Sequence, residues 1–148
     1  MTIETYDEYW KGSNFNDLKK YIISFSDENY KADEVIQSKC TCGNHVYQVQ
    51  HEPDEGFVKL TCSLCKQDKY IADCYELEND IEPEYLTCSC SNNIFEIGVG
   101  FAYRKKLFFK SDIKWITVGA RCAKCGIMGV PADWKIDYSP SLFLRDKI

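Results

Sequence analysis

The sequence predicts an α+β fold, in which a short N-terminal helical segment is followed by two tandem, β-hairpin-rich units packed as one body. Two observations lead to this prediction. Apolar residues recur at helical spacing before residue 40 and in short, often alternating runs after it, and eight of the nine cysteines fall into two sets with the pattern CxC…CxxC. These features divide the chain into an N-terminal helical segment (residues 1–39), a first copy (residues 40–86) and a second copy (residues 87–148).

The N-terminal segment contains one clear helical pattern. Asn14 and Asp17 resemble a capping pair, and we expect a helix from about residue 15 to 25. The apolar and aromatic residues that share one face of this helix are Phe15, Leu18, Tyr21, Ile22 and Phe25. Residues 27–37 match no single pattern.

From Cys40 onward, short runs rich in β-branched and aromatic residues predict strands. We expect them at residues 45–50, 57–62, 69–75, 94–103, 107–110, 114–120 and 127–137. Gly43 and Gly126 each directly follow a cysteine pair, where a tight turn favours positive φ. Ser91 and Lys66 stand at the equivalent positions, so their turns either differ or hold a side chain at positive φ.

The two cysteine sets belong to an internal repeat. Residues 40–49 match residues 88–97 at a constant offset of 48, whereas the second cysteine pair and the residues after it match at an offset of 60. The larger second offset places an insertion in the second copy, within residues 98–115. The repeat also aligns Cys74 with Trp134, which indicates that this ninth cysteine packs in the interior and is not a ligand.

Two closely spaced thiol pairs brought together by a β-hairpin predict a four-cysteine metal site. Zinc is the metal that a closed four-thiolate site favours, with iron as the main alternative. We therefore expect two zinc ions per chain, so that each copy is a zinc ribbon. The expected ligands are Cys40, Cys42, Cys62 and Cys65 in the first set and Cys88, Cys90, Cys122 and Cys125 in the second.

Disulfide bonding is the alternative use of these thiols, and it requires an oxidising compartment. The sequence starts with an acidic, polar stretch that lacks the basic start and apolar core of a signal peptide. It contains no run of the roughly 18–20 apolar residues that cross a membrane. These features predict a cytoplasmic location without membrane association, and they favour metal ligation.

The inserted segment combines basic and aromatic residues. We expect extended strands around a basic turn at Arg104, Lys105 and Lys106, and the aromatic residues of the segment are Phe101, Tyr103, Phe108, Phe109 and Trp115. These aromatic side chains either cover a joint core of the two copies or belong to a protruding recognition hairpin. Such a hairpin would suit single-stranded nucleic acid or a protein interface.

Charge is distributed unevenly along the chain. The formal net charge is −5, and each zinc ion with four thiolates contributes −2, so two occupied sites lower the total to about −9. The first copy carries ten acidic and three basic side chains, whereas the second carries five acidic and ten basic ones. An acidic block follows the first cysteine set and consists of Glu76, Glu78, Asp80, Glu82 and Glu84.

The sequence does not predict an enzyme. Four thiols close each metal site and leave no open coordination position for water or substrate. His45 and His51 both lie in the first copy, so the repeat gives them no shared role as ligands. Asp73 and Asp133 occupy equivalent positions, and we expect them to act structurally, through hydrogen bonds from local backbone N–H groups.

The stretch from Trp115 to Pro140, WITVGARCAKCGIMGVPADWKIDYSP, resembles the C-terminal half of a group of small bacterial twin zinc-ribbon proteins. The resemblance covers roughly residues 40–140, and it places zinc on the eight cysteines of the two sets. Some proteins of this group resemble the immunity partners of contact-dependent or polymorphic toxins. The resemblance therefore implies a toxin-neutralising role and brings no catalytic residues with it.

Two classes of function remain open. The first is a zinc-stabilised protein-binding module, in its sharpest form an immunity protein whose acidic block binds a basic toxin domain. The second is a nucleic-acid-binding zinc ribbon that uses Arg104, Lys105, Lys106, Lys110 and Arg121. A net charge near −9 opposes binding to phosphates, so we expect the first function and regard nucleic acid as an unfavoured partner. The oligomeric state stays open.

Overall fold

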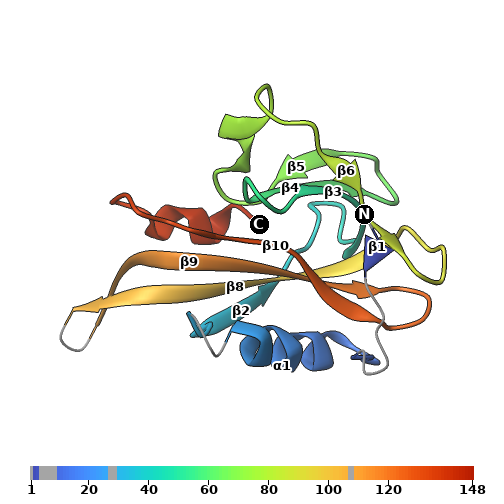
Figure 1. Cartoon of the computed structure of the whole chain (residues 1–148), viewed down its shortest axis with the longest axis horizontal. Coiled ribbons are helices and arrows are strands. Elements are labelled where there is room, and N and C mark those ends of the chain that lie inside the picture. Colours follow the sequence, from blue (N-terminus) through green and yellow to red (C-terminus); the bar gives the residue numbers. More distant parts are fainter. Residues whose placement is uncertain (1, 4–9, 27–29, 107–108) are drawn as a thin grey trace.

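The computed structural model describes residues 2–3, 10–26, 30–106 and 109–148, with side chains described for all of these except 2–3, 105, 106 and 109–111. It has an α+β architecture, with one α-helix and a large, mainly antiparallel sheet in the described part of the chain (Figure 1). The elements in chain order are β1 (Thr2–Ile3), α1 (Phe15–Ser26), β2 (Glu34–Gln37), β3 (Val46–Glu52), β4 (Phe57–Cys62), β5 (Asp68–Tyr70), the 3₁₀ helix η1 (Cys74–Leu77), β6 (Glu84–Tyr85), β7 (Thr87–Cys88), β8 (Phe95–Lys106), β9 (Phe109–Cys122), β10 (Met128–Lys135) and the 3₁₀ helix η2 (Leu142–Asp146).

The predicted helix and most of the predicted strands are confirmed, whereas the short strands β1, β6 and β7 were not predicted and other elements differ in their bounds. The strand expected at 69–75 ends at Tyr70, because the chain turns at Ala72, with φ 54°, and enters η1. Residues 109–110 of the strand expected at 107–110 and the strand expected at 114–120 belong to a single strand, β9, whereas residues 107–108 lie outside the described part of the chain. Residues 34–37 form β2, whose partner β8 lies far along the chain in the second copy, so local sequence patterns did not predict it.

The N-terminal end of α1 is capped as the sequence predicts. The side-chain oxygen of Asn14 accepts a hydrogen bond from the backbone N–H of Asp17 at 3.1 Å, and the Asp17 carboxylate accepts one from the N–H of Ser13 at 2.8 Å. Both bonds satisfy N–H groups at or next to the start of the helix, and the negative charge of Asp17 suits the positive end of the helix dipole. Leu18 and Ile22 face the sheet and are fully buried.

Three glycines allow α1 to lie directly on the sheet of the second copy. A Cβ atom at Gly119 would stand 2.5 Å from Ile22 Cδ1, and one at Gly98 or Gly100 would stand 3.0 or 2.8 Å from atoms of the same side chain. Any larger residue at these positions would push the helix away from the sheet. Figure 1 shows α1 below β8, β9 and β2.

The first copy has no such surface. The repeat aligns Gly98 with Gln50, Gly100 with Glu52 and Gly119 with Lys59, so long polar side chains stand where the helix would pack. The two copies therefore share the same arrangement of strands, but α1 covers the sheet of the second copy only.

The main sheet has the strand order β10-β9-β8-β3-β4-β5, and each half is an antiparallel three-stranded meander. The two meanders meet through β3 and β8, where Tyr47 pairs with Phe95. These two residues are equivalent in the repeat, because 95 is 47 plus the offset of 48. A residue that pairs with its own counterpart marks a local two-fold axis, so the copies are arranged like the subunits of a symmetric dimer.

Each copy also receives a strand from the segment that leads into the other copy. Gln37 in β2 pairs with Gly98 of the second copy, and its equivalent Tyr85 in β6 pairs with Gln50 of the first. The pattern continues one residue further, because the Ser38 N–H donates to the Ile97 carbonyl at 2.9 Å and the Leu86 N–H donates to the Val49 carbonyl at 2.8 Å. We call this arrangement the strand exchange.

The strand exchange crosses the predicted boundaries at residues 39 and 86. The leading strand of the first copy lies in the segment 1–39, and the leading strand of the second copy lies in the segment 40–86. The division into three segments stays a prediction.

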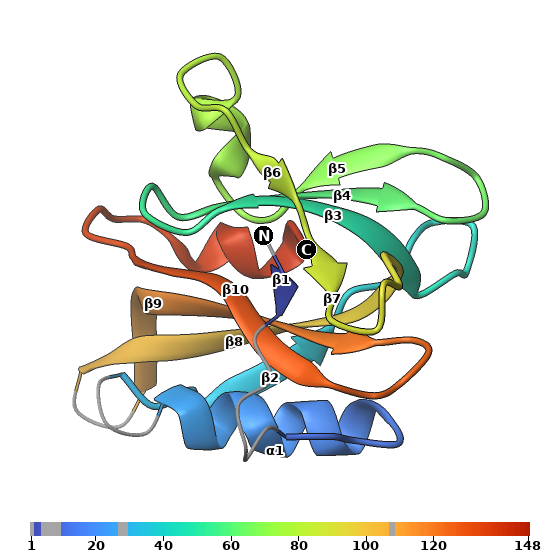
Figure 2. The same ribbon diagram turned by 45° about the vertical axis from the view of Figure 1, so that its right-hand side comes forward.

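One hydrophobic core serves both copies. Tyr47 and Leu60 from the first copy and Phe95, Ile97 and Val118 from the second are all within 1% of full burial and belong to the same cluster. Figure 2 shows the C-terminal segment with η2 lying between the β3–β4 hairpin and the β8–β9 hairpin. Leu144 of η2 is fully buried and joins the same cluster.

The insertion lengthens the β8–β9 hairpin. The pair Gly100 and Thr117 corresponds to Glu52 and Phe57, the last pair of the β3–β4 hairpin, and beyond it the second hairpin continues to the pair Lys106 and Phe109. This extension is visible as the long hairpin that protrudes in Figure 1.

The sequence left open whether the aromatic residues of the insertion cover a joint core or belong to a recognition hairpin, and the structure decides this for some of them only. Phe101 and Tyr103 are buried in the core, so they do not form a recognition surface. Trp115 is half-buried and stacks on Tyr30, with 4.5 Å between ring centroids. Phe108 and the side chain of Phe109 lie outside the described part of the chain, as do the side chains of Lys105, Lys106 and Lys110.

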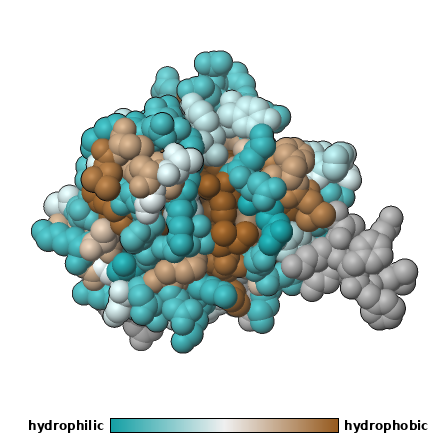
Figure 3. Space-filling view, turned by 180° about the vertical axis from the view of Figure 1, so that it is seen from behind, coloured by the Kyte–Doolittle hydropathy of each residue, from teal (hydrophilic) through white to brown (hydrophobic). Residues whose placement is uncertain are grey.

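Most of the surface seen from behind is hydrophilic, and a narrow band of apolar side chains crosses its centre (Figure 3). Among the described residues, no helix has both the length and the apolar composition needed to span a bilayer.

Candidate metal centres

The four cysteine pairs sit in turns that are closed by backbone hydrogen bonds at matching positions. The N–H of Cys40 donates to the carbonyl of Asn44, and the N–H of Cys88 donates to that of Asn92, each at 2.8 Å. The N–H of Cys62 donates to the Gln67 carbonyl at 2.9 Å, and the N–H of Cys122 donates to the Ile127 carbonyl at 2.8 Å. The repeat in sequence is therefore a repeat in local geometry.

All four turns use positive φ at the residue that follows the cysteine pair. The values are 94° at Gly43, 82° at Gly126, 76° at Ser91 and 65° at Lys66. Ser91 and Lys66 thus accept the conformation of the glycines, at a cost of roughly 1–2 kcal/mol each. Two strained residues at equivalent points indicate that the turn geometry is held by something stronger, as metal ligation would do.

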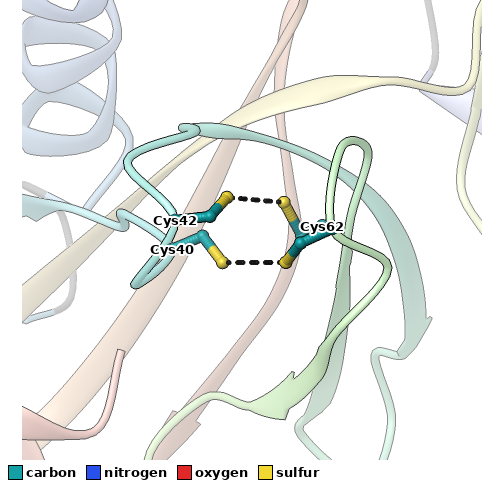
Figure 4. A group of neighbouring side chains, drawn as sticks. Cys40, Cys42 and Cys62 are labelled. Carbon is teal, nitrogen blue, oxygen red and sulfur yellow. Dashed lines mark hydrogen bonds between the residues drawn. The ribbon is translucent and has the colours of Figure 1, made fainter.

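The eight predicted ligands form two compact clusters, and Cys74 belongs to neither. Within each cluster all sulfur atoms lie within 4.8 Å of one another. The facing sulfur pairs are 3.5 Å apart for Cys40 and Cys65 and 3.6 Å apart for Cys42 and Cys62, the two contacts drawn in Figure 4. The equivalent pairs of the second cluster, Cys88–Cys125 and Cys90–Cys122, have the same separations of 3.5 and 3.6 Å.

These separations fit four ligands around one metal ion. A tetrahedron with metal–sulfur bonds of about 2.3 Å has sulfur–sulfur edges of about 3.8 Å. A disulfide bond would hold two sulfurs about 2.0 Å apart, and all nine cysteines are free thiols. The clusters can therefore each hold a metal ion, and the disulfide alternative is not adopted.

Each cluster includes an asparagine that the sequence analysis did not single out. The Asn44 side-chain amide donates to Cys62 Sγ at 3.3 Å and to the Val46 carbonyl at 2.9 Å. Asn92 donates to Cys122 Sγ at 3.2 Å and to the Ile94 carbonyl at 2.7 Å. Both asparagines occur in the matched stretch at the offset of 48, which was the available signal.

Hydrogen bonds lower the pKa of the thiol most strongly at Cys62 in the first cluster and at Cys122 in the second. Desolvation disfavours the thiolate of Cys62, but hydrogen bonds from Asn44 and from backbone N–H groups outweigh it and lower the pKa to about 5. At Cys122 desolvation is likewise outweighed, by backbone N–H groups and by Asn92, and the pKa falls to about 6. These two cysteines are equivalent, so each cluster offers a thiolate at neutral pH.

The pKa of the thiol is raised at Cys65, Cys88 and Cys125. Desolvation and the neighbouring sulfurs raise the pKa of Cys88 to about 12, because a second negative charge in the cluster is unfavourable. A divalent ion reverses this effect, since coordination favours the deprotonated thiol. The donor set therefore fits a soft divalent metal bound by four thiolates.

The two clusters differ in exposure. Cys42 and Cys65 of the first cluster are exposed, whereas no cysteine of the second is. The first cluster is thus more open to solvent than the second, in which Cys90 and Cys125 are partly buried and Cys88 and Cys122 are buried.

Cys74 is a packing residue, as the repeat predicts. Its side chain is 1% exposed, and burial raises the pKa of its thiol to about 12. The sulfur accepts a hydrogen bond from the N–H of Val58 at 3.4 Å. A protonated, enclosed thiol is a poor nucleophile and a poor ligand.

The paired carboxylates act structurally, but the partners we expected for them were wrong. Asp133 accepts a hydrogen bond from the indole N–H of Trp115 at 3.1 Å. Asp73 accepts from the indole of Trp134 at 3.3 Å and from the hydroxyl of Tyr138 at 2.8 Å. Side-chain donors replace backbone N–H groups here because the tertiary fold brings aromatic residues of the second copy beside these carboxylates.

Neither histidine belongs to a cysteine cluster. His45 is about half exposed, and its Nε2 lies 3.8 Å from Glu96. His51 is buried between the copies, where its Nδ1–H donates to the Pro131 carbonyl at 2.8 Å. Its Nε2 is enclosed without a hydrogen-bond partner in the described structure, and burial lowers the pKa of the ring.

The acidic residues predicted to bind a partner lie on one exposed segment between η1 and β6, which we call the acidic loop (residues 76–84). Glu76 is in η1, Glu84 is in β6, and all five acidic side chains are exposed. Figure 2 shows this segment, in green to yellow, projecting beyond the sheet. Lys59 lies 3.7 Å from Glu78 and balances part of the charge there.

Two basic residues considered for nucleic-acid binding are engaged in contacts within the protein, although Arg104 is exposed. Arg121 pairs with the buried Glu96 at 2.9 Å. Arg104 donates to the Ile136 carbonyl at 2.7 Å. Their guanidinium groups are thus used in the fold.

Comparison with protein-family models, with curated proteins and with solved structures found no match. The resemblance to twin zinc-ribbon proteins therefore rests on the residues quoted above.

Proposed function

We propose that this chain is a zinc-stabilised protein-binding module that holds one Zn²⁺ in each four-cysteine cluster and binds a basic partner protein through the acidic loop. The observation that carries the proposal is the contrast between the two kinds of site. The metal clusters are closed by four sulfurs, which suits a structural role. The acidic loop is exposed, has no basic residue, and extends away from the core.

Zinc as the metal is supported by the donor set and by the size of the protein. Small units of this kind obtain much of their folding free energy from the metal. Each copy contributes only part of a shared core, so the metal adds to the order of the turns that carry the cysteines. Each copy is then a zinc ribbon.

The charge of the loop supports a basic partner. Complementary charge speeds association and rejects partners of the wrong sign. The sharpest form of the proposal is toxin neutralisation, in which the partner is a basic toxin domain that acts on nucleic acid, as the resemblance to immunity proteins implies. Binding of nucleic acid by this chain itself is opposed by the use of Arg121 and Arg104 within the fold.

The experiment combines metal analysis with charge reversal. Elemental analysis of protein purified without added metal is expected to give two zinc ions per chain. A partner captured from the source cell is then titrated against the variant Glu76→Lys, Glu78→Lys, Asp80→Lys and against a matched triple reversal at the exposed Asp54, Glu55 and Asp137. We expect the first variant alone to slow association at least tenfold at low salt, with a smaller difference at high salt.

Two results would contradict the proposal. One is a zinc content near zero. The other is micromolar or tighter binding to single-stranded DNA or RNA at physiological salt, together with equal effects of the two charge reversals on the protein partner.

A further inference from the structure

Exposed aromatic side chains gather next to the acidic loop, where η1 meets the C-terminal segment. Tyr75 of η1 is 47% exposed, Phe143 of η2 is 45% exposed and Tyr138 is 40% exposed. The hydroxyl of Tyr138 donates to Asp73, the residue that precedes η1, and the ammonium of Lys147 lies close to both other rings. Residues far apart in sequence are thus brought into one surface cluster.

The cluster already holds a cation. The Nζ atom of Lys147 lies 5.3 Å from the centroid of the Tyr75 ring and 5.7 Å from that of the Phe143 ring. Both distances are within the range of about 6 Å for a cation–π interaction. Two rings therefore share one ammonium group.

The backbone of Lys147 is held by hydrogen bonds, and its side chain lies close to the two rings. The Lys147 carbonyl accepts a hydrogen bond from the Ala72 N–H at 2.6 Å, and its own N–H donates to the Leu144 carbonyl at 3.0 Å. The residue as a whole is exposed. The side chain can leave the rings without disturbing these backbone bonds, so another ammonium group can take its place.

The surroundings favour a positive ligand. Asp73 and Glu76 lie beside the cluster, and the rest of the acidic loop follows directly in sequence. Aromatic residues are enriched in the hot spots of protein interfaces. Carboxylates around such residues favour a cationic side chain of the partner over a neutral one.

We propose that Tyr75 and Phe143 form a receptor for a lysine side chain of the basic partner protein, and that Lys147 fills it until the partner displaces it. The inference rests on the proposed function, because it identifies the point at which a partner of the acidic loop is gripped. It adds that Lys147 of this chain competes with the lysine of the partner for the same two rings.

The test uses a fluorescein-labelled acetyl-hexalysine amide as the probe, titrated by anisotropy into the zinc-loaded full chain. Tyr75→Leu and Phe143→Leu keep apolar bulk but remove the rings, and each is expected to weaken binding about two- to fivefold, the size of an exposed cation–π contact. Lys147→Ala is expected to tighten binding by a similar factor, because the competitor is gone.

A matched control separates competition from net charge. Lys20→Ala removes the same charge from the exposed face of α1, on a different element. Equal tightening by Lys147→Ala and Lys20→Ala would overturn the proposal, as would unchanged binding in Tyr75→Leu. Circular dichroism and zinc content show that each variant is folded.

The outcome is distinguishable from failure of the proposed function. If the ring variants bind the peptide and the captured partner as the wild type does, while the charge reversals in the acidic loop still slow partner association, the lysine receptor is refuted and the binding module stands. If the charge reversals have no effect on the partner but the ring variants weaken peptide binding, the receptor stands and the assignment of the acidic loop is wrong.

Discussion

Replacement of Asn92 by alanine tests whether the asparagines beside the clusters support metal binding. The side chain donates one hydrogen bond to Cys122 Sγ at 3.2 Å and one to the Ile94 carbonyl at 2.7 Å. The first bond stabilises the thiolate, and the second closes the short turn from Asn92 to Ile94, directly before β8. Alanine removes both and leaves the ligands in place.

The expected loss follows from these two bonds. Removal of a group that orients a ligand typically weakens metal affinity 10- to 100-fold, which corresponds to about 1.4–2.7 kcal/mol. Loss of the bond to the Ile94 carbonyl adds about 1 kcal/mol to the destabilisation of the folded protein. We therefore expect zinc affinity to fall by one to two orders of magnitude and the free energy of unfolding to fall by about 2–4 kcal/mol.

The assay is competition for zinc with a chromophoric chelator, followed by denaturant unfolding of the zinc-loaded protein. Asn93→Ala is the matched control, because it removes the same side chain from the adjacent exposed position, where no hydrogen bond to a cysteine occurs in the described structure. If Asn92→Ala and Asn93→Ala have the same affinity and stability, the assigned role of Asn92 is refuted.

Four further results are expected. Cys122→Ser should release the metal ion of its own cluster and lower the free energy of unfolding by several kcal/mol, because metal binding and folding are coupled, whereas Cys74→Ala should lower it by about 1–2 kcal/mol and release none; melting curves with metal analysis decide this. Hydrogen peroxide should release zinc from the first metal site before the second, since only the first has exposed cysteines, and a chelator dye would record two phases of equal amplitude. Gly119→Val should lower the free energy of unfolding by about 1–3 kcal/mol, the usual penalty for overpacking, because a Cβ atom at this position would lie 2.5 Å from Ile22. Thermal melts at constant zinc would measure the loss. Burial lowers the pKa of His51 below 6.5, so below that pH the unfolded chain binds a proton that the folded chain does not. The free energy of unfolding should therefore fall as pH falls, by up to about 1.4 kcal/mol per pH unit. In urea denaturation, His51→Gln should flatten this pH profile.

The clusters were predictable because the ligands obey a strict spacing that is repeated. A pattern such as Cys62-x-x-Cys65 closes a turn on its own, and the intervening hairpin brings the second pair close, so no long-range information is needed. The helix was predictable for the same reason, since its apolar face and its cap at Asn14 are local features. The repeat also assigned Cys74 correctly to the interior.

The strand exchange and the surface cluster of Tyr75, Phe143 and Lys147 could not be predicted from local patterns. Strand β2 pairs with β8, which belongs to the other copy, and nothing in residues 34–37 specifies that partner. Tyr75 lies far from Phe143 and Lys147 in sequence, so only the packing of η2 against the first copy brings them together. Likewise, the aromatic donors to Asp73 depend on tertiary contacts that spacing alone does not reveal.

The local two-fold axis between Tyr47 and Phe95 has a consequence for stoichiometry. A true homodimer built on this axis would carry every surface twice and would bind two partners. Here both halves belong to one chain, so their sequences have diverged independently: the second half carries the glycine surface under α1, and the first carries the acidic loop. A molecule with dimer-like internal geometry therefore presents a single copy of each surface, and each chain should engage one partner.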